Sequence, residues 1–178
     1  MSELRTNRIV PRDGLPSGSS GGIIQIKSTT KTDTFTTAST SFTDVTGLSV
    51  SITPTRADSK IFVLVTSCGN TNGSKGYGRL MRDSTAIDIG TAEGNRPGAS
   101  FTLNSGTTNA TYANKLFNLS YFFLDSPSTT SATTYKIQLR NYSGDTSRYY
   151  TINRTENDSN VAYNQRGSSK ILLMEVSG

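Results

Sequence analysis

The feature that most constrains the fold of this chain is a succession of strand-length segments separated by turn residues. Residues 48–53 alternate strictly between apolar and polar side chains and end at Pro54, which predicts a strand with one face buried and the other in water. Residues 61–65 are apolar at consecutive positions. That pattern predicts a strand at 60–65 that is covered on both faces, either at the centre of a sheet or with its second face against another subunit.

Further segments of strand length follow the same rules along the rest of the chain. They lie at residues 23–27, 33–37, 76–89 (a hairpin that turns at Asp83 and Ser84), 116–124, 135–140, 148–153 and 170–176. The most apolar of them is 116–124, and 135–140 alternates as cleanly as 48–53. Residues 90–114 are rich in Gly, Asn, Ser and Thr and form a long excursion. This excursion is either a variable contact surface or a loosely packed edge strand.

The composition supports β-structure throughout. Apolar residues make up 33% of the chain and charged residues 17%, and Ser, Thr, Asn and Gly fill the gap. Threonine suits a pleated surface, and the other three supply turns. We therefore expect an all-β, antiparallel two-sheet β-sandwich of eight to ten strands, jelly-roll-like in topology. Periodicity alone leaves an immunoglobulin-like strand order open, although the chain has one cysteine and no tryptophan, unlike a true immunoglobulin domain.

Several classes of chemistry are disfavoured by the residues present. The chain contains no histidine and only one cysteine, Cys68, which removes most zinc sites and every catalytic arrangement that needs histidine. The acidic pairs Asp83 with Asp88 and Glu156 with Asp158 could in principle serve glycoside hydrolysis, but nothing places two carboxylates across a cleft. We expect no enzyme activity, no metal and no cofactor.

The distribution of charge and the lack of long apolar runs limit the kinds of partner that we expect. The net charge is +5 with a pI near 9.4, but the basic residues are spread along the whole chain, so nucleic acid is an unlikely partner. A small jelly-roll coat protein whose arm binds packaged nucleic acid stays an alternative. No apolar run has the length of a signal peptide or a bilayer span, so we expect synthesis in a cytoplasm and no membrane insertion.

Residues 1–22 differ from the rest and predict an extended N-terminal arm that ends in a Gly/Ser joint at 18–22, followed by a β-sandwich knob at 23–178. The arm holds few apolar side chains, and Pro11 and Pro16 interrupt regular structure. Ordering one residue costs roughly 1–2 kcal/mol, and burying one aliphatic side chain returns only about 1.5–3 kcal/mol. The arm therefore needs a partner outside its own domain.

Several stretches of the chain carry a family resemblance. They read SELRTNRIVPRDGLPSGSSGGIIQIK at 2–27, TDTFTTASTSFTDVTGLSVSITP at 32–54, SKIFVLV at 59–65, RLMRDSTAIDIG at 79–90, LDSPSTTSATTYKIQLR at 124–140 and SSKILLMEVSG at 168–178. With these stretches the chain resembles structural proteins of marine tailed phages, notably cyanophages, of the tail-fibre or head-decoration type. The resemblance implies a homotrimeric β-sandwich on the virion surface.

Two functions from different classes follow. In the first, the chain is a non-enzymatic virion structural protein whose arm docks on a capsid or tail component, through the side chains of Leu4, Arg5, Arg8, Ile9, Val10 and Arg12. In the second, it is a carbohydrate-binding, lectin-like module that contacts a host surface glycan. Exposed aromatic rings would then stack on sugars, and the candidates are Tyr77, Tyr142, Tyr149 and Tyr163.

Overall fold

The computed structural model describes residues 22–72, 76–102, 113–142, 145 and 147–177. Ten strands lie within these ranges: β1 (Ile23–Lys31), β2 (Phe35–Thr37), β3 (Thr43–Ile52), β4 (Lys60–Thr71), β5 (Gly76–Arg82), β6 (Thr85–Ile87), β7 (Phe117–Asp125), β8 (Thr133–Asn141), β9 (Tyr150–Ile152) and β10 (Ser169–Val176). The described residues contain no helix, and hence none with the length and apolarity of a bilayer span. The expected all-β fold is confirmed, with antiparallel sheets throughout.

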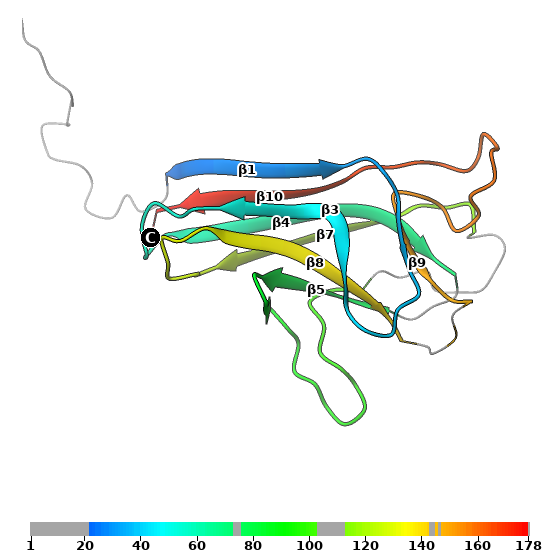
Figure 1. Cartoon of the computed structure of the whole chain (residues 1–178), viewed down its shortest axis with the longest axis horizontal. Coiled ribbons are helices and arrows are strands. Elements are labelled where there is room, and N and C mark those ends of the chain that lie inside the picture. The colour runs from blue at the N-terminus through cyan, green and yellow to red at the C-terminus, as the bar shows by residue number, and fades with distance from the viewer. Residues whose placement is uncertain (1–21, 73–75, 103–112, 143–144, 146, 178) are drawn as a thin grey trace, which may run out of the picture.

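The strands form two sheets that pack face to face (Figure 1). The first sheet runs β1-β10-β4-β7, with the short β9 beside the far end of β4 and β2 beside β9. The second sheet runs β3-β8-β5-β6. Apart from the short β2 and β9, the strands pair in a nested order along the chain, the first with the last and so on toward the middle. The pairs are β1 with β10, β3 with β8, β4 with β7, and β5 with β6. This nested order is that of a jelly roll and not of an immunoglobulin domain.

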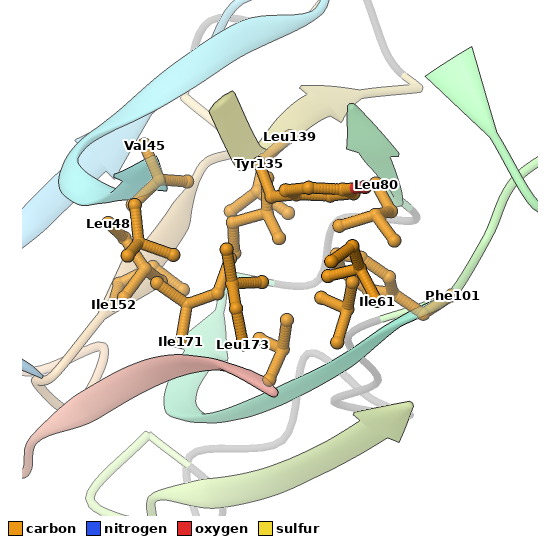
Figure 2. Packing of buried hydrophobic residues seen from close by; sticks show 14 of the residues in the cluster. Val45, Leu48, Ile61, Leu80, Phe101, Tyr135, Leu139, Ile152, Ile171 and Leu173 are labelled. Carbon is orange, nitrogen blue, oxygen red and sulfur yellow. The ribbon is translucent and has the colours of Figure 1, made fainter. Parts of the chain in front are cut away.

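The core lies between the two sheets, where alternate side chains of each strand point inward (Figure 2). In β3 the apolar residues of the alternating segment are buried and Ser49 and Ser51 are exposed, as their spacing predicts. The largest side chains with almost no exposed surface come from both sheets: Leu48, Ile52, Leu80, Tyr135, Ile137 and Leu139 from the second, and Lys31, Ile61, Tyr150, Ile152, Ile171 and Leu173 from the first.

The structure places the two most apolar segments differently from each other. β4 lies in the middle of the first sheet, and its inward residues Ile61, Val63 and Val65 have no exposed surface. Its outward residues Phe62 and Leu64 are only half-buried, so no described residue fully covers the second face of this strand. β7 has the richest apolar pattern but lies at the edge of the sheet, beside β4 only.

The two ends of the described chain meet at one end of the sandwich. The backbone N–H of Ser177 donates to the carbonyl of Gly22 at 3.3 Å, because β1 and β10 are antiparallel neighbours. At the same end, Asp125 of β7 accepts hydrogen bonds from Arg82 of β5 (2.9 Å) and Tyr135 of β8 (2.7 Å), which ties the two sheets together. The first described residue, Gly22, therefore lies beside the end of β10.

Candidate interaction surfaces

The outward side of the first sheet carries a continuous group of apolar side chains, which we call the apolar face. Because side chains alternate along a strand, the register of the sheet brings together Ile23 and Ile26 of β1, Leu172, Met174 and Val176 of β10, Phe62 and Leu64 of β4, and Phe122 and Leu124 of β7, while Ile24 lies in the irregularity of β1 between Ile23 and Gln25. Phe122 is 68% exposed, Ile26 is 55% exposed and Leu124 is 53% exposed. Residues of this size and exposure in one patch mark an interaction site.

The apolar face is ordered by cross-strand pairs. Leu64 lies opposite Phe122 and Phe62 lies opposite Leu124, and the rings of Phe62 and Phe122 stack with their centroids 6.0 Å apart. Among the described outward residues of these four strands, only Lys60 and Lys170 are charged, and they sit at opposite ends of the sheet. The surface between them is neutral and offers burial as its main source of binding energy.

A pocket of about 550 Å³ adjoins the apolar face where β4 and β7 run on past Leu64 and Phe122. Its walls carry no charged side chain and combine polar with apolar groups, from Thr66, Ser67, Cys68, Leu116, Asn118, Leu119, Ser120, Gln165, Gly167 and Ser168. Burial raises the pKa of the Cys68 thiol above its ordinary value, so this sulfur stays protonated at neutral pH. The pocket extends the apolar face with groups that can donate and accept hydrogen bonds.

The outward side of the second sheet is different, because it is polar and basic. A group that we call the arginine–tyrosine cluster lies on it, formed by Phe42, Tyr77, Arg79, Arg140 and Tyr142. The guanidinium of Arg79 lies 4.0 Å from the ring centroid of Phe42, and that of Arg140 lies 5.5 Å from the same centroid and 5.9 Å from that of Tyr77. The rings of Tyr77 and Tyr142 meet edge to face at 6.4 Å.

Asp44, a carboxylate whose charge acts on Arg79, already accepts hydrogen bonds from other side chains. Asp44 accepts hydrogen bonds from Lys136 (2.7 Å) and Gln138 (2.6 Å), and Lys136 holds the pKa of that carboxyl below its ordinary value. Arg79 donates from Nε to Gln138 at 2.8 Å, while no described residue accepts a hydrogen bond from the buried Nε of Arg140. Burial, and then the charge of Arg140, lower the pKa of Arg79. The charge of Asp44 still acts on Arg79, but neither Arg79 nor Arg140 forms an ion pair with a described carboxylate.

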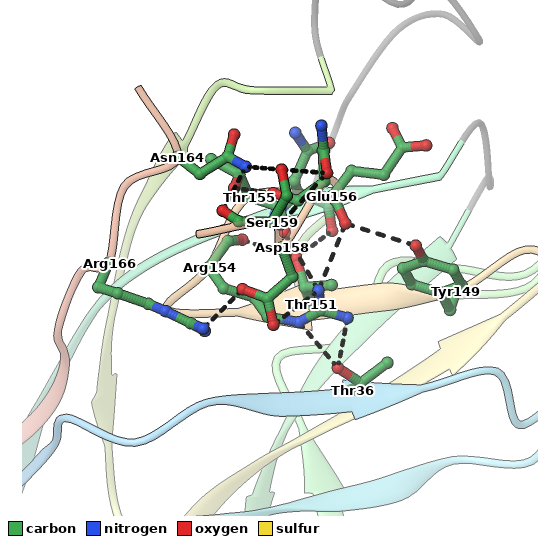
Figure 3. A network of polar contacts seen from close by, with 12 residues as sticks. Thr36, Tyr149, Thr151, Arg154, Thr155, Glu156, Asp158, Ser159, Asn164 and Arg166 are labelled. Carbon is green, nitrogen blue, oxygen red and sulfur yellow. Dashed lines mark hydrogen bonds and ion pairs between the residues drawn. The ribbon is translucent and has the colours of Figure 1, made fainter. Parts of the chain in front are cut away.

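The other two candidate tyrosines lie elsewhere. Tyr149 belongs to a polar network around Arg154 that fastens the segment after β9 to β2 (Figure 3). In it Arg154 donates to Thr36 at 3.2 Å and pairs with Asp158, which also pairs with Arg166 at 2.6 Å. Tyr163 is 59% exposed on that same segment. Of the four tyrosines proposed for a glycan site, only Tyr77 and Tyr142 are in contact with each other.

Three of the four acidic residues considered for hydrolysis, Asp83, Asp88 and Asp158, have structural partners. Asp83 and Asp88 adopt positive φ in or beside the β5–β6 hairpin, and their carboxylates accept from the Thr134 backbone N–H (2.8 Å) and the Tyr121 hydroxyl (2.6 Å). Asp158 is held by two arginines, and burial raises the pKa of Glu156. Among the described residues, no three histidine, cysteine or acidic side chains are grouped as metal ligands.

The residues predicted to dock on a partner lie outside the described ranges. Part of the arginine–tyrosine cluster, in turn, was not predicted from the sequence. Leu4, Arg5, Arg8, Ile9, Val10 and Arg12 all lie outside the described residues, so the docking arm stays a prediction. Phe42, Arg79 and Arg140 were missed, since only the register of β5 against β8 brings Tyr77 opposite Arg140. The alternating pattern of 135–140 does place Lys136, Gln138 and Arg140 on one solvent-facing side of the strand, and this pattern could have pointed to a basic surface there.

The chain was also compared with known proteins. No protein-family model matches it, and no curated protein does so either.

Proposed function

We propose that this chain is a non-enzymatic structural protein of a tailed-phage virion, made in the host cytoplasm and assembled as a homo-oligomer, a trimer, on the particle surface. The observation that supports this most is the apolar face, with Phe122 and Leu124 more than half exposed at its edge. A second copy of the chain is the occupant that we assign to it. The resemblance to tail-fibre and head-decoration proteins implies a trimer of the same kind.

The size of the apolar face suits an interface between copies. Ile23, Ile24, Ile26, Phe122 and Leu124 are each between 42% and 68% exposed. A large side chain exposed to this degree leaves on the order of 100 Å² in contact with water. Together with the half-buried neighbours on β4 and β10, these residues approach the roughly 800 Å² that each partner contributes to a stable interface. A monomer rarely leaves so much contiguous apolar surface in water.

The arm completes this proposal. Gly22 lies beside Ser177 at the end of the β1–β10 pair, and Ile23 and Ile24 at the border of the apolar face follow at once. Gly22, where the described chain begins, therefore lies at the edge of the proposed interface. We assign docking on a capsid or tail component to the arm side chains of Leu4, Arg5, Arg8, Ile9, Val10 and Arg12.

Deleting residues 2–22 tests the arm separately from the knob. Because the core and the apolar face lie within 23–177, the shortened chain should fold and keep the oligomeric mass of the full chain. It should be missing from purified particles, where immunogold labelling or a particle reconstruction would find the full chain. Normal incorporation of the shortened chain would contradict the docking role, and absence of the full chain from particles would contradict the virion role.

A second function is supported by a different observation, the contact between Tyr77 and Tyr142. These two rings lie on the second sheet, away from the apolar face, with Tyr142 58% exposed. A host-binding, lectin-like knob would present such rings to sugars. Screening the full chain against a broad glycan array tests this role, and Tyr142→Ala should weaken any glycan that binds here. Silence across the array would contradict it.

A further inference from the structure

We propose that the arginine–tyrosine cluster is a binding site for an anionic saccharide, one that carries carboxylate or sulfate groups on its sugar rings. The inference rests on the carbohydrate-binding role proposed above for this face and adds the chemical class of the ligand. It is independent of the oligomeric state and of the arm. Its central residues are Tyr77, Arg79, Arg140 and Tyr142.

The first reason is positive charge that forms no ion pair. Arg79 and Arg140 both lie against the ring of Phe42, at 4.0 and 5.5 Å, and neither forms an ion pair with a described carboxylate. Asp44, whose charge acts on Arg79, accepts its hydrogen bonds from Lys136 and Gln138. Two guanidinium groups held side by side repel each other unless an anion lies between or over them, and a planar carboxylate or a sulfate matches their forked donors.

The second reason is preorganisation. Phe42 stacks on Arg79, Gln138 accepts from its Nε at 2.8 Å, and Tyr77 lies 5.9 Å from Arg140. The ring contact and the hydrogen bond hold the guanidinium of Arg79 before a ligand arrives, so less of its side-chain entropy is lost on binding. The terminal nitrogens of Arg79 have no described acceptor among their neighbours and can bind the anion.

The third reason is the adjoining aromatic surface. Tyr142 contacts Tyr77 edge to face and is 58% exposed, so it presents aromatic surface beside the ring that the guanidinium of Arg140 approaches. Sugar rings stack on such surfaces, whereas a free small anion gains nothing from them. A nucleic acid is less well matched, because tight binding takes roughly 6–10 phosphate contacts and this face offers Arg79, Arg140 and the already paired Lys136.

Direct binding to defined probes tests the inference. The full chain is immobilised, and oligogalacturonate, dextran sulfate, neutral dextran and a single-stranded oligonucleotide are each passed over it. At least one of the two acidic saccharides should bind, more weakly as salt rises, and neutral dextran should not. Which acidic probe binds identifies the anion. A lack of binding by both, or equal binding of the oligonucleotide, would overturn the proposal.

Matched variants locate the site. Arg140→Gln and Tyr142→Ala should each lower the affinity for the acidic saccharide at least tenfold. Two control variants change the same kinds of group elsewhere: Arg96→Gln removes the charge of an exposed arginine on the β6–β7 connection, and Tyr163→Ala removes an exposed ring. The affinity of both controls for the acidic saccharide should stay within twofold of wild type. Equal losses in Arg96→Gln and Arg140→Gln would overturn the site. Circular dichroism checks that each variant is folded, and Tyr142→Ala provides a second test if Arg140→Gln is not.

The same experiment separates this inference from the function on which it rests. If a neutral glycan binds through Tyr142 and the acidic probes do not, the anionic class is wrong and carbohydrate binding stands. If no saccharide of either kind binds, both are wrong.

Discussion

Glu175 is a carboxylate with no exposed surface in β10, between β1 and the connection from β3 to β4. It accepts hydrogen bonds from Gln25 Nε2 at 2.6 Å and from the backbone N–H and the hydroxyl of Thr55, both at 2.7 Å. Burial by itself raises the pKa of Glu175, but these hydrogen bonds outweigh it and bring the pKa to about 2. The carboxylate therefore stabilises the fold only while it is ionised.

The stability of the protein should accordingly depend on pH in acid. The folded pKa of Glu175 lies below its ordinary value of 4.5, so its contribution is complete above that value and is lost as the pH falls through the folded pKa. Allowing for partial screening, we expect about 2 kcal/mol of the free energy of unfolding to be at stake. Urea unfolding at pH 7 and pH 3 measures it, with Glu175→Gln expected to show a flatter pH dependence and a lower stability at pH 7.

Asp58 provides the matched control, since it is an exposed carboxylate paired only with Arg56. Asp58→Asn should keep a pH dependence close to that of wild type. If Glu175→Gln and wild type lost stability in parallel between pH 7 and pH 3, the role assigned to Glu175 would be wrong.

At the scale of the elements, the length of β4 depends on a close approach between two strands. Its last residues, 69–71, pair with β9, and a Cβ placed at Gly69 would lie 2.0 Å from the carbonyl oxygen of Thr151 in β9. Because that atom belongs to the backbone, one of the two strands would have to move. The register of β9 and of the segment that follows it rests on this glycine.

Gly69→Ala should therefore destabilise the knob by about 2 kcal/mol through overpacking, which lowers the melting temperature by roughly 4–8 °C in a protein of this size. Thermal unfolding followed by circular dichroism checks this. Gly22→Ala is the control, because a Cβ at Gly22 would meet nothing within 4 Å, and its melting temperature should not change. Equal melting temperatures for the two variants would contradict the close approach.

The elements also show which parts of the structure the sequence could predict. Alternation in 48–53 and 135–140 predicted the strands and their inward faces, because period two depends only on the local chain. Alternation carries no information on which strands become neighbours. The edge position of β7, the exposure of Phe122 and the contact of Tyr77 with Tyr142 all depend on pairings between distant segments. The consecutive apolar run in β4 predicted a strand covered on both faces, whereas the described residues leave Phe62 and Leu64 on its second face half-buried.

At the scale of the whole molecule, the two outer faces differ in chemistry and suit different roles. The first sheet exposes Ile26, Phe122 and Leu124, while the second exposes serines and the arginine–tyrosine cluster. If copies associate through the first sheet, the second sheet faces outward and stays accessible to a ligand. The strand order alone does not require this division, since a jelly roll can be polar on both outer faces.

The central claim is that the apolar face is covered by other copies of the chain, and the mass of the full chain in solution tests it most directly. Light scattering after gel filtration should give a trimer, three times the 19.1 kDa of one chain. Phe122 is 68% exposed in the single chain, so the charge that Phe122→Asp introduces should leave the fold intact but disrupt an interface that buries it. This variant should elute as a monomer. The control variant Tyr163→Asp should elute as a trimer. A monomeric wild-type chain, or a folded Phe122→Asp variant that is still trimeric, would contradict the claim.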